Sequence, residues 1–178
     1  MKKLFKGLFS IFLFLVLTSG ILFAIYPKQS KKFLLESIAT ITPILIKSDP
    51  YQENKYGVHP LLYQKVEQMR LQLQKEGIYI KVIRGHRNLK EQARLYAQGR
   101  TTKGGIVTNA IPGLSFHNYG WAVDVVVFEN GKPKWNNRHW DRIGEVGKSL
   151  GLTWGGDWKK LVDRPHFQLK IKDILLAD

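Results

Sequence analysis

Three residues in the C-terminal half of the chain are of types that ligate metal ions and stand where they could form one site. His117 precedes the strand-prone run that contains Asp124, and His166 opens a second strand-prone segment. Imidazole nitrogens and a carboxylate oxygen are typical zinc ligands, and a catalytic zinc ion keeps a further position open for water or substrate. If the two segments are neighbouring strands, the three side chains can converge into a site for metal-assisted hydrolysis.

Asp124 stands in the middle of an apolar run, residues 123–127. A carboxylate in such a run costs free energy unless it is paired or bound to a metal ion. A metal ligand satisfies this requirement. So does a simpler interpretation, in which Asp124 pairs with an arginine or caps a turn and both histidines are hydrogen-bonded core residues. The spacing alone leaves both interpretations open.

Hydrolysis at a metal ion also needs a base that takes the proton of the attacking water. Asp163 lies shortly before His166 in the sequence, which places a second carboxylate near the metal without making it a ligand. The chain has no cysteine. That absence excludes thiol nucleophiles, Cys-ligated zinc, disulfides and a lipoprotein anchor.

The elements that must position these residues follow from residue periodicity and capping. Pro60 suits the first turn of a helix, Asn88 and Glu91 form a capping-box pattern, and Asn130-Gly131 is typical of a hairpin turn. Helices are expected over 61–75, from 89 to near 99, and over 138–150, and strands over 78–83, 121–128 and 165–171.

Helices come first and strands cluster later, which predicts an α+β domain with a small antiparallel sheet flanked by helices. Residues 99–116 form a glycine-rich loop of unusual length for a compact domain. Loops of this length are commonly functional, so we expect a functional role for this one.

The N-terminal part of the chain reads as a membrane segment. Lysines precede an apolar stretch from Gly7 to Tyr26, and twenty helical residues span about 30 Å, the thickness of a hydrocarbon core. A cleaved signal peptide is the alternative, because residues 18–20 are small. We expect an anchor or signal segment at 1–27, a stalk at 28–50 and the catalytic domain at 51–178.

The charge of the chain indicates an anionic partner. Lys and Arg number 28 against 14 acidic residues, a formal net charge of +14. Nucleic acid, anionic lipid and anionic wall polymer all fit that sign, and so does a surface that is charged only for solubility. No dense run of Lys and Arg is present, so we do not expect nucleic acid as the partner.

Two motifs resemble those of a known family. They are Ser115-x-His117-x-x-Gly120-x-Ala122-x-Asp124 and Asp163-x-Pro165-His166. The pattern is similar to the VanY/VanX-type zinc D,D-peptidases and, within them, to the L-alanyl-D-glutamate endopeptidases of bacilli and phage lysins. Further matches, which extend the resemblance over residues 57–170, are Gly85-His86-Arg87, Gln92, Leu95, Tyr96, residues 99–101, residues 107–110 and residues 154–158.

The resemblance implies a small α+β domain whose antiparallel sheet carries a zinc site, and it implies a role for each matching residue. It makes His117, Asp124 and His166 the zinc ligands. It makes Asp163 the general base, and it places Arg87 near the scissile carbonyl, where a guanidinium would stabilise the oxyanion.

Other matching positions are expected to contact the substrate or to support the site. These are Ser115, Gln92 and Asp157. Two departures from the family pattern bear on the site: His86 replaces an aromatic residue, and Gln168 stands where the family often has Glu. Neither removes a ligand or the base, so we expect an active enzyme.

Taken together, these features predict a zinc-dependent peptidoglycan hydrolase that cleaves the L-Ala–D-Glu bond of the stem peptide. It is expected to act as a monomer on the outer face of the cell, held in the membrane by a single N-terminal helix or secreted if that segment is cleaved. The alternatives are a D-alanyl-D-alanine carboxypeptidase of the same fold and a non-catalytic wall-binding module.

Overall fold

The computed structural model describes residues 51–175. The expected membrane segment and stalk therefore lie outside the described residues. Within residues 51–175, no helix is both long enough and apolar enough to cross a bilayer.

The helices are α3 (Pro60–Lys75), α4 (Leu89–Ala97), α5 (Trp140–Ser149) and α6 (Ile171–Leu175), with 3-10 turns η1 (Phe116–Tyr119) and η2 (Gly155–Asp157). The strands are β1 (Ile80–Arg84), β2 (Ala122–Glu129), β3 (Lys132–Lys134), β4 (Thr153–Trp154) and β5 (His166–Gln168).

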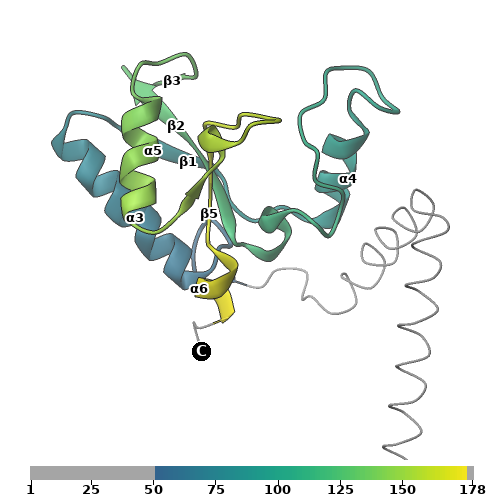
Figure 1. Cartoon of the computed structure of the whole chain (residues 1–178), viewed down its shortest axis with the longest axis horizontal. Coiled ribbons are helices and arrows are strands. Elements are labelled where there is room, and N and C mark those ends of the chain that lie inside the picture. Colours follow the sequence, from purple (N-terminus) through teal and green to yellow (C-terminus); the bar gives the residue numbers. More distant parts are fainter. Residues whose placement is uncertain (1–50, 176–178) are drawn as a thin grey trace, which may run out of the picture. The chain divides into compact units, whose positions relative to one another are not determined.

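The strands form one antiparallel sheet in the order β1-β2-β5-β4, and β3 extends β2 as a hairpin (Figure 1). The hairpin turn is made by Asn130 and Gly131, both with positive φ, at 50° and 75°. This is the conformation that an Asn-Gly turn favours. The α+β class and the hairpin were therefore predicted correctly.

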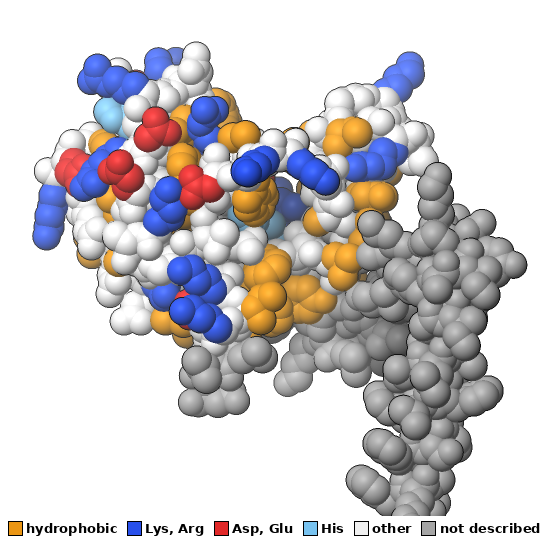
Figure 2. Space-filling view, in the orientation of Figure 1, with side chains coloured by type: hydrophobic (Ala, Val, Ile, Leu, Met, Phe, Trp, Pro, Cys, Tyr) orange, Lys and Arg blue, Asp and Glu red, His pale blue; other side chains and the backbone are white. Residues whose placement is uncertain are grey.

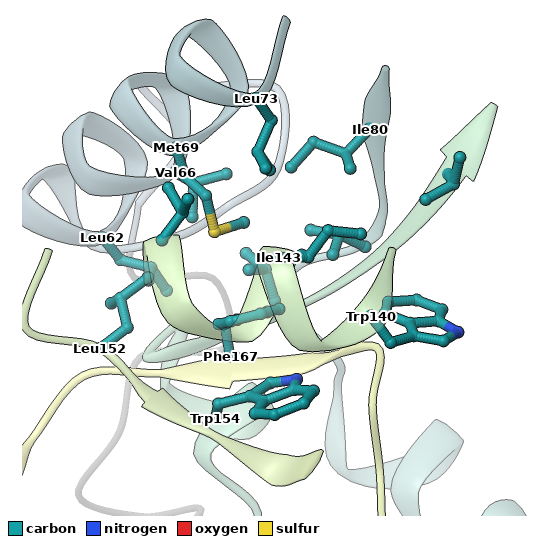
Figure 3. Packing of buried hydrophobic residues seen from close by; sticks show 14 of the residues in the cluster. Leu62, Val66, Met69, Leu73, Ile80, Trp140, Ile143, Leu152, Trp154 and Phe167 are labelled. Atoms are coloured by element: carbon teal, nitrogen blue, oxygen red, sulfur yellow. The ribbon is translucent and has the colours of Figure 1, made fainter. Parts of the chain in front are cut away.

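Helices α3 and α5 cover one face of the sheet (Figure 1). The face of α3 that carries Leu62, Val66, Met69 and Leu73 is buried, as its helical spacing predicts. Figure 3 shows these side chains in one buried cluster with Ile80 of β1, Ile143 of α5 and Phe167 of β5. Helix α5 packs so closely on β5 at Gly147 that a Cβ on this residue would come 2.3 Å from the ring of Phe167.

The opposite face of the sheet carries polar side chains. In β2, Val123 and Val125 belong to the helix-side core, so the intervening Asp124 points the other way. In β5, Phe167 belongs to the core, which puts His166 and Gln168 on the same face as Asp124. Alternation along two paired strands thus selects which residues can form a site.

Helix α4 and the long loop that follows it lie on this polar side (Figure 1). Asn88 and Glu91 make the reciprocal capping box that the sequence predicts: the Asn88 side chain accepts from the Glu91 N–H at 2.9 Å, and Glu91 accepts from the Asn88 N–H at 3.2 Å. The loop is held by Arg100, which donates to the carbonyl groups of Tyr96 and Thr108 at 2.8 and 3.0 Å. The loop is thereby fixed beside α4.

The C-terminal end of the described chain differs from expectation. The last strand covers only His166–Gln168, shorter than the predicted 165–171, and the short helix α6 follows it. Within residues 51–175, this strand is bordered by β2 and β4, so pairing ends where those two strands end.

Candidate active site

Strand pairing brings two of the expected ligands together. β2 and β5 are antiparallel neighbours, and Asp124 lies directly opposite His166 in their register. Residues opposite each other on one face of an antiparallel pair have Cβ atoms about 4.5–5.5 Å apart. The convergence that the sequence made conditional on neighbouring strands is therefore present.

His117 reaches the same point from the turn η1, just before β2. The chain leaves η1 through Gly120, which has a φ of 66°, in the left-handed region. A Cβ at Gly120 would lie 2.6 Å from the carbonyl oxygen of Gly57. Glycine is needed here both for the turn and for this close approach, and the turn aims a buried imidazole at the sheet.

The three side chains present a compact triangle of ligand atoms. His117 Nε2 lies 3.2 Å from Asp124 Oδ1 and 3.2 Å from His166 Nδ1, and His166 Nδ1 lies 3.3 Å from Asp124 Oδ1. Tetrahedral ligands with bonds of about 2.0 Å to a zinc ion are about 3.3 Å apart. Within residues 51–175, these three residues are the one group of His and acidic side chains arranged to hold a metal ion.

Hydrogen bonds on the outer side of each ring determine which nitrogen faces the triangle. His117 Nδ1 donates to the carbonyl of Gly85 at 2.9 Å, and His166 Nε2 donates to the amide oxygen of Gln168 at 2.9 Å. The inner nitrogens of the neutral rings are therefore lone-pair acceptors. Two lone pairs and a carboxylate at this separation repel one another unless a cation lies between them. The arrangement fits a metal ion well.

The charge on Asp124 depends on its neighbours. Burial acts to raise its pKa, but hydrogen bonds from His117 and His166 outweigh burial and hold the pKa well below its ordinary value. A divalent cation bound beside this carboxylate would also favour its charged form. The second carboxylate oxygen accepts from Arg87 Nη2 at 3.4 Å.

Arg87 lies at the edge of the triangle, and hydrogen bonds to its side chain and its backbone hold it there. Its Nη1 donates to Gln92 at 2.9 Å, and its backbone carbonyl accepts from the side chain of Asn118 at 2.7 Å. Its buried Nε has no hydrogen-bond partner among the described residues. Such unmet donors are rare in folded proteins and recur at functional sites.

Asp163 lines the same cleft from the segment before β5. Its backbone is fixed, since its N–H donates to the Gly155 carbonyl at 2.9 Å and its carbonyl accepts from the His166 N–H at 3.1 Å. Its carboxylate has no hydrogen-bond or ion-pair partner among residues 51–175, and burial raises its pKa. A half-buried carboxylate without a partner beside a metal site is suited to accept a proton.

The triangle lies in a cleft of about 740 Å³. Figure 2 shows the molecule hollowed between the sheet and the part that carries α4, with histidine surface visible inside the hollow. Two tryptophans lie along the cleft: Trp158 packs on the His166 ring with centroids 4.9 Å apart, and Trp135 is 56% exposed. A cleft of this volume has room for part of a peptide, not only for a small ion.

The remaining predicted site residues occupy different places. Ser115 is buried and lines the cleft, near His117. Gln92 is fully buried behind Arg87, so it supports the guanidinium and does not touch the cleft. Asp157 lies outside the cleft lining, and its carboxylate pairs with Lys148 of α5 at 3.0 Å. The expectation that Asp157 contacts the substrate or supports the site stays a prediction.

Sequence reasoning missed two residues that shape the site. Asn118 accepts from the Gly113 N–H at 3.0 Å while it donates to the Arg87 carbonyl, and so ties the long loop to the arginine turn. Lys160 lines the cleft from the loop before β5. The position of Asn118 directly after His117 was an available signal, because a polar residue beside a buried ligand is commonly a support.

Comparison with known proteins gives a family match that includes His117, Asp124 and His166. Residues 108–169 match a family described as D-alanyl-D-alanine carboxypeptidase. The chain is 38% identical over 122 residues to the peptidoglycan L-alanyl-D-glutamate endopeptidase CwlK of Bacillus subtilis, a match that covers 63% of this chain and 73% of that protein. It is also 38% identical over 61 residues to an L-alanyl-D-glutamate peptidase of Listeria phage A118, which covers 33% of this chain and 22% of that protein.

Solved structures share the fold. The L-Ala D-Glu endopeptidase ChiX of Serratia marcescens superposes with a TM-score of 0.52 at 28% identity, over 72% of this chain and 92% of its own. The D,D-pentapeptidase VanY of a VanB-type vancomycin resistance cassette, solved with Zn(II), gives a TM-score of 0.51 at 16% identity, over 70% of this chain and 80% of its own. At that identity the VanY likeness concerns the fold alone.

Proposed function

Because the chain belongs to the VanY-type peptidase family, close to its L-alanyl-D-glutamate endopeptidase branch, we propose that it cleaves the L-Ala–D-Glu bond of peptidoglycan stem peptides with a zinc ion held by His117, Asp124 and His166. Family membership makes it a metallopeptidase that acts on peptidoglycan. The identity of the metal, the bond that is cut and the role of each residue are the proposal.

One observation carries this proposal. The triangle of ligand atoms and the carboxylate of Asp163, which has no partner among residues 51–175, line the same cleft. A simple buried ion pair would explain the triangle, but it would not explain a second carboxylate that is left without a hydrogen bond beside it. Hydrolysis requires both parts, a cation and a base.

The site residues divide the work as follows. A zinc ion, when bound, supplies Lewis acidity toward a peptide carbonyl and toward water. Asp163 takes the water proton and passes it to the leaving amine. Arg87 donates to the carbonyl oxygen as negative charge develops there, an interaction that strengthens in the transition state. Ser115 lies close enough to His117 in the cleft wall to contact the substrate.

Two rivals make different predictions. A D-alanyl-D-alanine carboxypeptidase would use the same metal site and base on a different bond, and its description is that of the matching family. A wall-binding module that has lost activity would have no need for the Asp163 carboxylate. The identity to CwlK over most of that protein's length supports the endopeptidase bond.

A pair of synthetic peptides tests the choice of bond. The purified chain is incubated with one peptide that contains L-Ala–D-Glu and one that ends in D-Ala–D-Ala, and the products are measured by mass spectrometry. We expect cleavage of the first peptide alone. Release of D-Ala from the second, with the first left intact, would move the enzyme to the carboxypeptidase branch.

The location of the enzyme belongs to the same proposal. The substrate lies outside the cytoplasm, and residues 7–26 have the length and apolarity of a membrane span. We therefore propose that the domain faces outward from an N-terminal anchor, or is secreted after cleavage. Protease treatment of intact cells should remove the domain, and full protection in intact but not in lysed cells would contradict this topology.

A further inference from the structure

A second cavity, of about 470 Å³, adjoins the catalytic cleft. It is formed by the end of β1, one side of α4 and the start of the long loop. Arg87 and Leu95 line both cavities. The two cavities therefore share a wall at these side chains. Metal binding, proton transfer and oxyanion stabilisation all take place in the catalytic cleft and leave the second cavity unused.

The lining of the second cavity is strongly basic. Besides Arg87 it contains Arg84, Arg94 and Lys103, against the single acidic residue Glu91. Glu91 is already occupied, because it accepts from the Asn88 N–H at 3.2 Å and pairs with Arg84 at 3.5 Å. The Glu91 carboxylate therefore caps α4 and neutralises Arg84, and it does not pair with the other basic residues of the cavity.

Arg94 and Lys103 are the uncompensated charges of this cavity. Both are exposed, and neither has a side-chain hydrogen bond or an ion pair within residues 51–175. Arg100, on the same stretch of chain, is different: it donates to the carbonyl of Tyr96 and to the side chain of Asn109 at 2.8 and 3.0 Å. Arg100 holds the loop, whereas Arg94 and Lys103 have no structural task there and remain available to an anion.

We propose that Arg94 and Lys103 form a subsite for a free carboxylate of the substrate peptide. This inference rests on the proposed function, in which the substrate contains D-glutamate. A glutamyl residue within a peptide chain keeps one free carboxyl group, and an extended chain advances only about 3.3 Å per residue. Such a carboxylate can reach a cavity that shares Arg87 with the catalytic cleft, and a guanidinium binds carboxylates with two parallel hydrogen bonds.

The test compares two substrates and two forms of the full-length enzyme with the wild type. The substrates are L-Ala–D-Glu–L-Lys peptides whose free glutamyl carboxyl is either an acid or an amide. The double variant Arg94→Gln/Lys103→Gln removes both charges, and Lys90→Gln removes one charge from an α4 residue that lines neither cavity. Cleavage gives kcat/KM, and calorimetry gives the Kd of each peptide for the enzyme.

We expect amidation to lower kcat/KM about 10-fold in the wild type and in Lys90→Gln, since hydrogen bonds between charged groups are the strong ones. In the double variant the acid should lose the same factor and the amide should be unaffected. An equal response to amidation in wild type and double variant would overturn the subsite.

Two more results distinguish a carboxylate subsite from a wrong substrate and from a phosphate site. If the wild type cleaves neither peptide, the proposed function fails, and the difference in Kd between acid and amide still decides the subsite. If the double variant loses retention on a phosphodiester polymer while its peptide Kd values are unchanged, the subsite binds wall phosphate and the carboxylate assignment is wrong.

Discussion

The guanidinium of Arg87 donates to the amide oxygen of Gln92 at 2.9 Å, and Gln92 is fully buried. The same amide donates in the other direction to the Ala110 carbonyl at 2.7 Å. One side chain therefore links the arginine of the cleft to the long loop. The loop and Arg87 are parts of one hydrogen-bonded unit.

This link predicts that two substitutions of Gln92 lower the stability alike but differ in their effect on kcat. Gln92→Met and Gln92→Glu both leave the Ala110 carbonyl without its donor, which should cost about 1–3 kcal/mol of unfolding free energy in each. Only Gln92→Met also removes the acceptor of Arg87. We expect kcat to fall about 10-fold or more in Gln92→Met and to be largely retained in Gln92→Glu. Equal kcat in both variants would reduce Gln92 to a purely structural residue.

Gln168 should set the metal affinity through His166. Its amide oxygen accepts from His166 Nε2 at 2.9 Å and so presents the other ring nitrogen to the metal. Gln168→Leu removes this acceptor and should weaken zinc binding about 10- to 100-fold. Gln168→Glu keeps the acceptor and serves as the control. Competition against a chromophoric chelator measures both, and unchanged affinity in Gln168→Leu would contradict the ligand assignment of His166.

Asp163 should separate catalysis from metal binding. Asp163→Asn keeps the shape of the side chain but cannot take a proton, so kcat should fall by at least about 100-fold. Zinc content and binding to purified cell wall should be unchanged, because Asp163 is outside the ligand triangle. A variant that retains turnover would assign the base elsewhere in the cleft, and a variant that loses zinc would make Asp163 a ligand.

His59 predicts a stability that depends on pH. Its Nδ1 accepts from the Leu61 N–H at 3.2 Å and caps helix α3, and burial lowers the pKa of this imidazole. A lowered folded-state pKa means that the unfolded chain binds the proton more readily. The stabilisation is therefore complete above the unfolded pKa of about 6.5 and declines as the pH falls below it.

The matched variant for this prediction is His59→Asn, which keeps a good N-cap residue without a titrating group. Denaturant midpoints measured at pH 8 and pH 5 should differ less in His59→Asn than in the wild type. An unchanged difference would show that other groups carry the pH dependence.

Local patterns sufficed for much of the fold. The spacing of Leu62, Val66 and Met69 predicted the buried face of α3, and the Asn88–Glu91 pair predicted the start of α4. Such features depend on neighbours in sequence, so a single chain reveals them. The end of the last strand did not follow in this way, because it depends on how far β2 and β4 extend beside it.

The sequence indicated which residues converge at the site, but not most of the groups that hydrogen-bond to them and hold them in place. Asp124 stood out because a charge in an apolar strand needs a partner, and the strand register then placed it opposite His166. Asn118 contacts Arg87 across 31 positions of sequence, and its place beside His117 was the one local signal for this support. The Gly85 carbonyl accepts from His117 across 32 positions, and no local pattern marks that contact. Asp157 belongs to the matching stretch 154–158 but lies outside the cleft lining, in the turn η2, where its carboxylate pairs with Lys148.

The most direct test of the central claim is digestion of purified peptidoglycan by the full-length enzyme, with and without a zinc chelator, followed by mass spectrometry of the products. The proposed mechanism predicts fragments with new D-Glu N-termini that disappear on chelation and return when zinc is restored. Release of free D-Ala would contradict the choice of bond. Intact peptidoglycan in the presence of zinc-loaded enzyme would contradict the assignment of this site to wall hydrolysis.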